Sequence, residues 1–252
     1  AWGKQVLAIT IASEFVPMFE IKNAEEFTKR YNIDHDVLSL DILDYEEVAQ
    51  NQNDRCYYCK SKVYYALLKI AKIHNQDFVI DGTNFSDIAV YRPGLKALKE
   101  LNIVSPFSEA AITKQDIIAL SEELNLPSQN IPQMACLATR IPYGVPITRE
   151  ILEMIENAES FLRSKIPGIS KTPIRVRYED MINDIKAARI EVQPQFVPII
   201  ASPEYREKIL EYFEGLGFKY VMLDLSGFES GKIDRLINNN GSKGNNNHNR
   251  NS

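Results

Sequence analysis

Short apolar segments alternate with amphipathic segments in the first third of the chain. Residues 6–11 (VLAITI), 36–40 (DVLSL) and 78–80 (FVI) are runs of the kind found in short buried strands. Between them, the spacing predicts one helix around residues 23–31, introduced by a capping-box pattern, and another over residues 56–73. Strands that alternate with helices in this way favour right-handed crossovers and a parallel sheet.

A loop with many prolines is predicted in the middle of the chain. Thr113 and Asp116 form a capping box that opens a helix ending near Leu124. Residues 127–146 then contain prolines at both ends and show no helical or strand periodicity. A loop of this length without secondary structure inside a compact protein more often has a function than serves only as a connection.

The pattern changes after this loop. A helix is predicted from Thr148 to about Lys165, followed by two segments, residues 174–178 (IRVRY) and 187–192, in which apolar and polar positions alternate. Such alternation is typical of strands with one face turned to something polar. A further helix after Ser202 and a last strand at residues 220–225 complete the prediction.

This change of character predicts two domains and a tail. We expect an α/β domain with a parallel sheet over residues 1–147 and a smaller α+β domain over residues 148–237. Residues 238–252 are mostly Asn, Gly and Ser. Because such a segment cannot bury apolar area, it is expected to be disordered.

The overall composition excludes several classes of protein. The chain has 252 residues, 44% of them hydrophobic, and its 29 Lys and Arg against 34 Asp and Glu give a net charge of −5. This charge balance argues against a protein that binds nucleic acid through a basic surface. No run approaches the roughly 18 apolar residues of a membrane helix, and the first residues do not resemble a signal peptide. We therefore expect a cytoplasmic protein with no membrane partner.

Three cysteines are the strongest candidates for chemistry. Cys56 and Cys59 form a C-x-x-C pair at the start of a predicted helix, where the helix dipole favours the thiolate, and Cys136 lies in the proline-bounded loop. Three thiolates without a fourth leave one coordination position open, as in a catalytic centre. A redox pair, or a structural zinc site completed by His35 or His74, is the alternative.

Two further sets of polar residues are candidates. Arg140, Arg175 and Arg177 carry guanidinium groups suited to two-point contacts with carboxylate or phosphate, and Glu191 on the following strand could supply a carboxylate for metal binding or charge balance. A solvated strand face is the alternative. Residues 81–84 (DGTN) follow a predicted strand, where ligands bind in parallel sheets, although the same residues form ordinary turns.

A series of motifs resembles the LarE family, which consists of ATP-dependent sulfur transferases of the adenine nucleotide alpha hydrolase (PP-loop) fold. The resemblance covers residues 6–237, essentially the whole chain except the tail. The motifs, in order, are RCYYCK (55–60), DGTN (81–84), YRPG (91–94), MACLATRIPYG (134–144), IRVRY (174–178) and LDLSGFESG (223–231).

The resemblance implies a reaction. LarE proteins use ATP, with Mg²⁺ expected, to adenylate a carboxylate of pyridinium-3,5-biscarboxylic acid mononucleotide, and then deliver sulfur to give a thiocarboxylate for the nickel-pincer cofactor. One branch sacrifices the sulfur of a single cysteine in the loop that matches Cys136. Another branch has three cysteines that hold a [4Fe-4S] cluster, whose unique iron carries exogenous sulfide. With Cys56, Cys59 and Cys136, this sequence resembles the cluster branch.

The resemblance also assigns roles to single residues. It places Cys136 in the sulfur-delivery loop, Arg140 in contact with substrate phosphate or AMP, and Arg175 and Arg177 near the active site. Further residues match positions of the metal site (Glu159 and Glu191) and of the nucleotide side (Gly82 and Arg92). The family's usual acidic residue just before YRPG is replaced here by Val90.

One departure from the family pattern concerns ATP. This fold binds pyrophosphate in an S-G-G-x-D-S loop, where backbone N–H groups surround the phosphate, and the sequence contains no two adjacent glycines. The family pattern places that loop upstream of residues 6–11, so we expect that residues before Ala1 are missing from this sequence.

The resemblance also implies binding partners, and two other functions remain as alternatives. The implied partners are a small-molecule nucleotide substrate and a sulfide donor, with a homo-oligomer suggested by the relatives. A tRNA thiolase of the same fold is one alternative, against which the negative net charge weighs. A protein that stores or senses an iron–sulfur cluster without hydrolysing ATP is the other.

Overall fold

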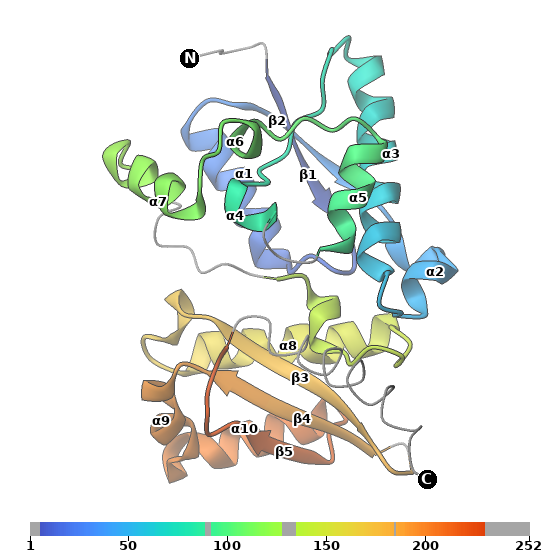
Figure 1. The fold of residues 1–252 in the computed structure, drawn as a ribbon. Helices are drawn as coiled ribbons and strands as arrows, with labels where there is room; N and C mark the ends of the chain where they lie inside the picture. Colours follow the sequence, from blue (N-terminus) through green and yellow to red (C-terminus); the bar gives the residue numbers. More distant parts are fainter. Residues whose placement is uncertain (1–5, 89–91, 128–134, 184, 230–252) are drawn as a thin grey trace, which may run out of the picture. The chain divides into compact units, whose positions relative to one another are not determined.

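The computed structural model divides the chain into two compact units, residues 1–160 and 161–252, and each is described by itself (Figure 1). The described residues are 6–88, 92–127, 135–183 and 185–229. The tail predicted to be disordered and Val90 lie outside these ranges. The two units divide within helix α8 (Arg149–Lys165). The domain boundary expected at residue 147 lies just before this helix and remains a prediction.

The first unit contains a parallel pair of strands. β1 (Leu7–Ala12) pairs with β2 (Asp34–Ser39), with Leu7 opposite Asp34 and Ala12 opposite Ser39. Parallel neighbours need a crossover connection, and α1 (Met18–Arg30) supplies it. The α/β character and the parallel pairing predicted from the sequence are confirmed for this part of the chain, whereas assignment to the PP-loop fold remains a prediction.

Two local predictions in this unit are wrong. Residues 78–80 do not form a strand of the sheet, because their pairing is limited to one parallel bridge between Ile80 and Val104. The side chains of Phe78 and Ile80 are largely exposed, so burial does not favour a longer ladder. The capping box expected at residues 23–26 lies inside α1, which begins directly after Pro17.

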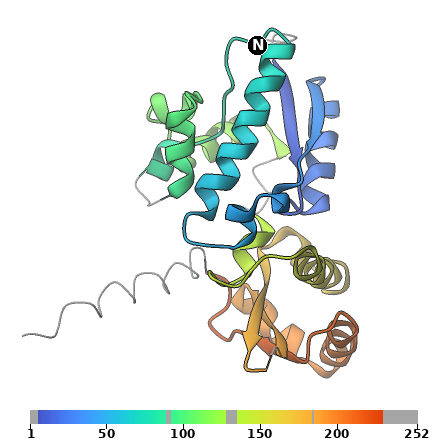
Figure 2. The same ribbon diagram turned by 90° about the vertical axis from the view of Figure 1, so that its right-hand side faces the viewer.

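Helices α2 (Glu46–Ala49), α3 (Arg55–Ile73) and α5 (Pro93–Glu100) follow the strand pair. Both views show α3 beside α5 (Figures 1 and 2). Tyr64, Leu98 and Ile103 form a small buried cluster at this contact. The start of α5 approaches α3 closely, because a Cβ added to Gly94 would lie 2.7 Å from Cδ of Lys60.

Short helices lie on either side of α5 in the chain. α4 (Phe85–Ile88) precedes α5, and α6 (Pro106–Glu109) and α7 (Lys114–Glu123) lead from it toward the proline-bounded loop. The predicted capping box of α7 is confirmed: the backbone N–H of Thr113 donates to Asp116, and that of Asp116 donates to Oγ1 of Thr113. No helix in the described ranges has both the length and the apolar content needed to cross a bilayer.

The second unit contains a mixed three-stranded sheet with helices. β3 (Ile174–Met181) pairs antiparallel with β4 (Ile185–Val192), and β4 pairs parallel with β5 (Tyr220–Leu223). The intervening chain forms α9 (Val197–Ala201) and α10 (Pro203–Gly215). The three strands predicted for this part of the sequence are therefore present, with shifted ends.

Candidate functional site

The three cysteines come from two distant segments of the first unit. Cys56 and Cys59 lie in the first turns of α3, and Cys136 immediately precedes the short 3₁₀ helix η4 (Leu137–Arg140). All three are free thiols of intermediate burial. Nη1 of Arg55, the residue directly before Cys56, donates to the carbonyl oxygen of Ala138, two residues after Cys136, so the segments that carry the cysteines meet despite their separation in sequence.

The thiol pKa values differ from the sequence-based expectation. Burial, the largest cause, acts together with the neighbouring Cys136 and Cys56 to raise the pKa of Cys59 to about 12. Burial also raises the pKa of Cys56, although Arg55 acts in the opposite direction. Burial thus acts against the effect expected from the helix start, and the pKa of each of these two thiols lies above its usual value.

Three thiols are the right type of ligand for an iron–sulfur cluster, and they share one place in the fold. However, within the described ranges, no three His, Cys, Asp or Glu side chains converge closely enough to hold a metal ion. The cysteines thus fit a cluster in chemistry and location, but their side chains are not arranged as a ligand set.

The two histidines proposed to complete a zinc site lie elsewhere. His35 is on β2, and its Nε2 is 2.8 Å from the hydroxyl oxygen of Thr10 on β1. His74 follows the last residue of α3, at the opposite end of the helix from Cys56. Neither histidine therefore supports a zinc site at the cysteines.

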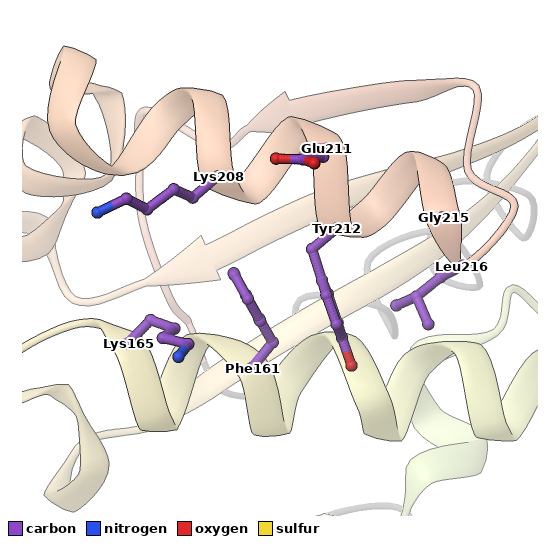
Figure 3. Close-up of a pocket in the computed structure, with 7 residues that line it drawn as sticks. All are labelled: Phe161, Lys165, Lys208, Glu211, Tyr212, Gly215 and Leu216. Atoms are coloured by element: carbon purple, nitrogen blue, oxygen red, sulfur yellow. The ribbon is translucent and has the colours of Figure 1, made fainter.

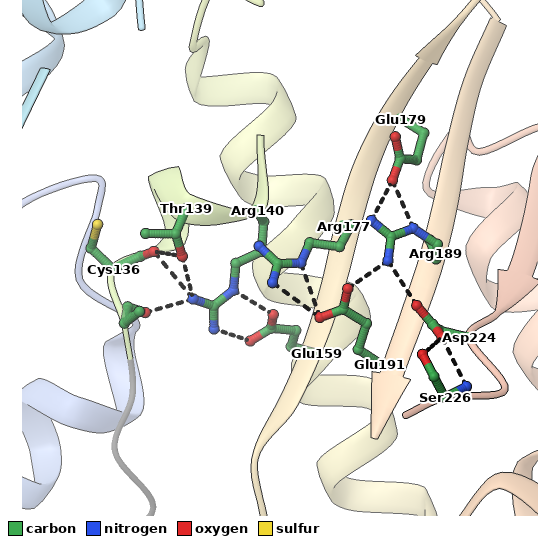
Figure 4. Close-up of polar contacts among 11 residues, drawn as sticks. Cys136, Thr139, Arg140, Glu159, Arg177, Glu179, Arg189, Glu191, Asp224 and Ser226 are labelled. Atoms are coloured by element: carbon green, nitrogen blue, oxygen red, sulfur yellow. Dashed lines mark hydrogen bonds and ion pairs between the residues drawn. The ribbon is translucent and has the colours of Figure 1, made fainter. Parts of the chain in front are cut away.

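Arg140 fixes the backbone next to Cys136. Its Nη1 donates to the carbonyl oxygens of Ala135 (2.6 Å) and Cys136 (3.1 Å), and Thr139 also donates to the Cys136 carbonyl. The other side of the guanidinium forms a two-point ion pair with Glu159 (Figure 4). With 1% of Arg140 exposed, these contacts hold the loop and place its guanidinium beside Cys136.

Asn51 and Arg55 are site residues that sequence reasoning missed. Both are buried at the junction of α2 and α3, next to the cysteine pair. Asn51 bonds to the carbonyl oxygens of Pro142 and Val145, and Arg55 bonds to that of Ala138. The only signal available in the sequence was the position of Arg55 directly before Cys56.

A chain of ion pairs crosses the sheet of the second unit. The Glu191 carboxylate lies between two arginines: Arg177 contacts Oε2 at 3.0 Å, and Arg189 contacts Oε1 at 2.5 Å (Figure 4). Arg189 also pairs with Glu179 and Asp224. Arg189 was not among the predicted site residues, although it lies two positions before Glu191 in a predicted strand, a spacing that puts both side chains on one face.

The remaining predicted arginine also lies on β3. Arg175 is 7% exposed, and its guanidinium lies 4.6 Å from the ring centre of Phe228. Arg175 and Arg177 are both buried, which excludes the alternative that they belong to a solvated strand face. Their predicted role in substrate binding remains a prediction.

The predicted nucleotide-side residues flank a hydrogen-bonded turn. Asp81 accepts hydrogen bonds from Ser105, Thr83 and Tyr64. Burial by itself would raise the pKa of Asp81, but these donors hold it below its usual range. Gly82 borders open space, and the half-exposed Arg92 pairs with Asp87 at 2.9 Å, so both predicted residues are accessible in part.

Two cavities lie away from the predicted site residues. One, of about 560 Å³, belongs to the second unit, where Phe161 and Tyr212 stack at 4.1 Å beside Lys165 and Lys208 (Figure 3). The other, of about 580 Å³, lies in the first unit along α3 and α2 and is lined by several tyrosines and lysines. None of the residues assigned from the sequence lines either cavity.

Comparisons with known proteins place the chain in a family. No family model matches it. An uncharacterized protein of Synechocystis sp. is 33% identical, over 93% of this chain and 84% of its own length. An uncharacterized protein of Methanocaldococcus jannaschii is 35% identical, over 90% and 82%. The pyridinium-3,5-bisthiocarboxylic acid mononucleotide synthase of Lactiplantibacillus plantarum is 32% identical, over 92% and 80%. The chain therefore belongs to the family of this synthase, the LarE family.

Proposed function

We propose that the protein is an ATP-dependent sulfur transferase that converts a carboxylate of pyridinium-3,5-biscarboxylic acid mononucleotide into a thiocarboxylate. The observation that carries the proposal is the contact between Arg55 and Ala138, which brings the start of α3, with Cys56 and Cys59, to the segment that follows Cys136 in the first unit. The name of the Lactiplantibacillus relative supports the substrate class, because its product carries two thiocarboxylates.

The chemistry explains why ATP is required. A carboxylate is a poor electrophile, so one of its oxygens first attacks the α-phosphorus of ATP and releases pyrophosphate. Sulfide then attacks the carbonyl carbon of the acyl adenylate, and AMP leaves with the former carboxylate oxygen. Mg²⁺ would balance the charge of the leaving pyrophosphate. No electrons are transferred in this sequence, so no oxidant or reductant is needed.

We assign the sulfur-carrying step to the three cysteines. They would hold a [4Fe-4S] cluster, which supplies an iron without a protein ligand at which exogenous sulfide can be held. Arg140 and Thr139 fix the Cys136 carbonyl and thereby set where this cysteine lies.

The charged residues are proposed to handle the substrate and the metal ion. Arg175 and Arg177 would contact the phosphate of the substrate, since guanidinium groups bind phosphate at two points. Arg140, Gly82 and Arg92 remain proposed contacts of the nucleotides. Glu159 and Glu191 remain proposed metal ligands, and each would share its oxygens with an arginine that it already contacts.

The experiment measures both halves of the reaction in one anaerobic mixture. The protein, reconstituted with iron and sulfide, is incubated with Mg-ATP, sulfide and the dicarboxylate nucleotide. We expect AMP release and a product whose mass reflects replacement of one oxygen by sulfur. Cys136→Ser should lose sulfur transfer but retain AMP release, and Ser164→Ala, an exposed change on α8, should behave like the wild type.

Two results would contradict the proposal. One is a wild-type mixture that releases no AMP and forms no thiocarboxylate. The other is sulfur transfer by Cys136→Ser at the wild-type rate.

A further inference from the structure

We infer that Asn51 and Arg55 act together as positioning residues that hold the segment after Cys136 against the helix that carries Cys56 and Cys59. We call these two residues the Asn51–Arg55 latch. The inference rests on the proposed function only in taking the three cysteines as the sulfur site.

Asn51 is the centre of the latch. It is fully buried, and its Nδ2 donates to the carbonyl oxygens of Pro142 and Val145, each at 2.8 Å. Its own carbonyl oxygen accepts from the N–H of Gly144 at 3.0 Å. Asn51 also has a φ of 56°, a conformation that asparagine tolerates better than most residues. The side chain and the backbone carbonyl of Asn51, just after α2, together hold a turn of the distant loop at three points.

Arg55 holds the same segment closer to Cys136. Its Nη1 bonds to Oδ1 of Asn51 and to the carbonyl oxygen of Ala138, the latter at 3.2 Å. The guanidinium carbon lies 5.3 Å from the ring centre of Tyr143. Arg55 therefore contacts one residue within η4 and another shortly after it, and it directly precedes Cys56 in the chain.

The opposite side of the loop is anchored as well. The N–H of Leu137 donates to the carbonyl oxygen of Phe15 at 2.9 Å, and Arg140 bonds to the Cys136 carbonyl. These contacts alone would connect the loop to the turn after β1 and to α8 but not to α3. In the described ranges, the latch supplies side-chain hydrogen bonds from the start of α3 and the residues just before it, so it sets how far Cys136 lies from Cys56 and Cys59.

The charge of Arg55 adds a second argument. Arg55 is 2% exposed, and among the described residues no carboxylate pairs with it. A buried cation without an anionic partner is costly. The guanidinium of Arg55 therefore depends on the oxygen atoms of Asn51 and Ala138 that it contacts.

Thiol crosslinking in the iron-free protein tests the latch without requiring activity. The reduced, full chain is treated with dibromobimane, which becomes fluorescent when it joins two thiols, in a Cys59→Ser background where Cys56 and Cys136 remain. We expect Arg55→Met to slow formation of the fluorescent crosslink about tenfold, because the loop loses its hydrogen bonds to α3. Arg55→Lys, which keeps the charge and one donor, should lie in between.

A control and a second measurement keep the result clear. Arg30→Met, at an exposed arginine of α1, should crosslink at the rate of the parent protein. Thermal unfolding of each variant shows whether the fold is intact, and if Arg55→Met does not fold, Arg55→Lys alone decides the question. Equal crosslinking rates in a folded Arg55 variant and in the parent would overturn the inference. If Arg55→Met slows the crosslink but the wild-type protein transfers no sulfur, only the proposed function is refuted.

Discussion

Arg140 and Glu159 form a two-point ion pair that is withdrawn from solvent. Nε of Arg140 donates to Oε1 of Glu159 at 2.8 Å, and Nη2 donates to Oε2 at 3.1 Å. The same guanidinium bonds to the Cys136 carbonyl. The position of the cysteine loop is thus coupled to a buried charge on α8.

Breaking this pair should be strongly destabilising. Glu159→Gln leaves a buried guanidinium without its counter-charge, so we expect the free energy of unfolding of the first unit to fall by about 3–5 kcal/mol. Urea denaturation measures the change. Glu153→Gln, an exposed change on the same helix, should remain within about 0.5 kcal/mol of the wild type. A similar loss of unfolding free energy in both variants would show that the Arg140–Glu159 pair stabilises the fold no more than an exposed glutamate does.

The ion-pair chain of the second unit gives a matched comparison between two glutamates. Glu191 is fully buried between Arg177 and Arg189, whereas the side chain of Glu179, which also pairs with Arg189, is 30% exposed. Glu191→Gln should cost about 3–5 kcal/mol of unfolding free energy. Glu179→Gln should cost about 1 kcal/mol or less, because water screens its pair. The reverse order, measured by urea denaturation, would be inconsistent with this structure.

Two glycines should respond differently to a methyl group. Gly227 has a φ of 75°, and a Cβ there would lie 2.7 Å from the carbonyl oxygen of Val192, whereas a Cβ at Gly82 would meet no atom within 4 Å. We expect Gly227→Ala to lower stability by about 1–3 kcal/mol and Gly82→Ala to change it by about 0.5 kcal/mol or less. Thermal or urea unfolding distinguishes them, and a neutral Gly227→Ala would contradict the backbone geometry described here.

Asp81 should contribute stability that depends on pH. Hydrogen bonds from Ser105, Thr83 and Tyr64 hold its pKa below the usual range despite burial. A carboxyl with a lowered pKa stabilises the fold above its unfolded value, about 3.9, and loses this contribution as the pH falls through the folded value. The stability difference between wild type and Asp81→Asn should therefore be largest near neutral pH and shrink below about pH 4.

The control for this experiment is Asp77→Asn, at an exposed position near the end of the preceding loop. It should change the free energy of unfolding by no more than about 0.5 kcal/mol. A difference between wild type and Asp81→Asn that grows as the pH falls would mean that the pKa of Asp81 is raised rather than lowered.

Structure that depends on residues close together in the chain was predicted correctly from the sequence, whereas pairing between segments far apart in the chain was not. The Thr113–Asp116 capping box is satisfied within one helical turn, so the sequence alone was sufficient. The strand expected at residues 78–80 was wrong because apolar residues do not reveal whether a neighbouring strand is present to pair along their length.

The residues of the candidate site also include some that the sequence predicted and some that it did not. The cysteines were identifiable because few other side chains bind iron–sulfur clusters. Asn51 and Arg55 were not, since their importance depends on the carbonyl oxygens of Ala138, Pro142 and Val145, which only the folded chain brings near. Arg189 could have been found in part, because it alternates with Glu191 along one predicted strand, but its pairing with Asp224 depends on the folded sheet.

Anaerobic reconstitution with iron and sulfide, followed by metal analysis and absorption spectroscopy, addresses the proposed sulfur site itself. We expect about four iron atoms per chain and a visible absorbance band in the wild type, and loss of that band in Cys136→Ala. A colourless wild-type protein that binds a single zinc ion would contradict the assignment of Cys56, Cys59 and Cys136 to an iron–sulfur cluster.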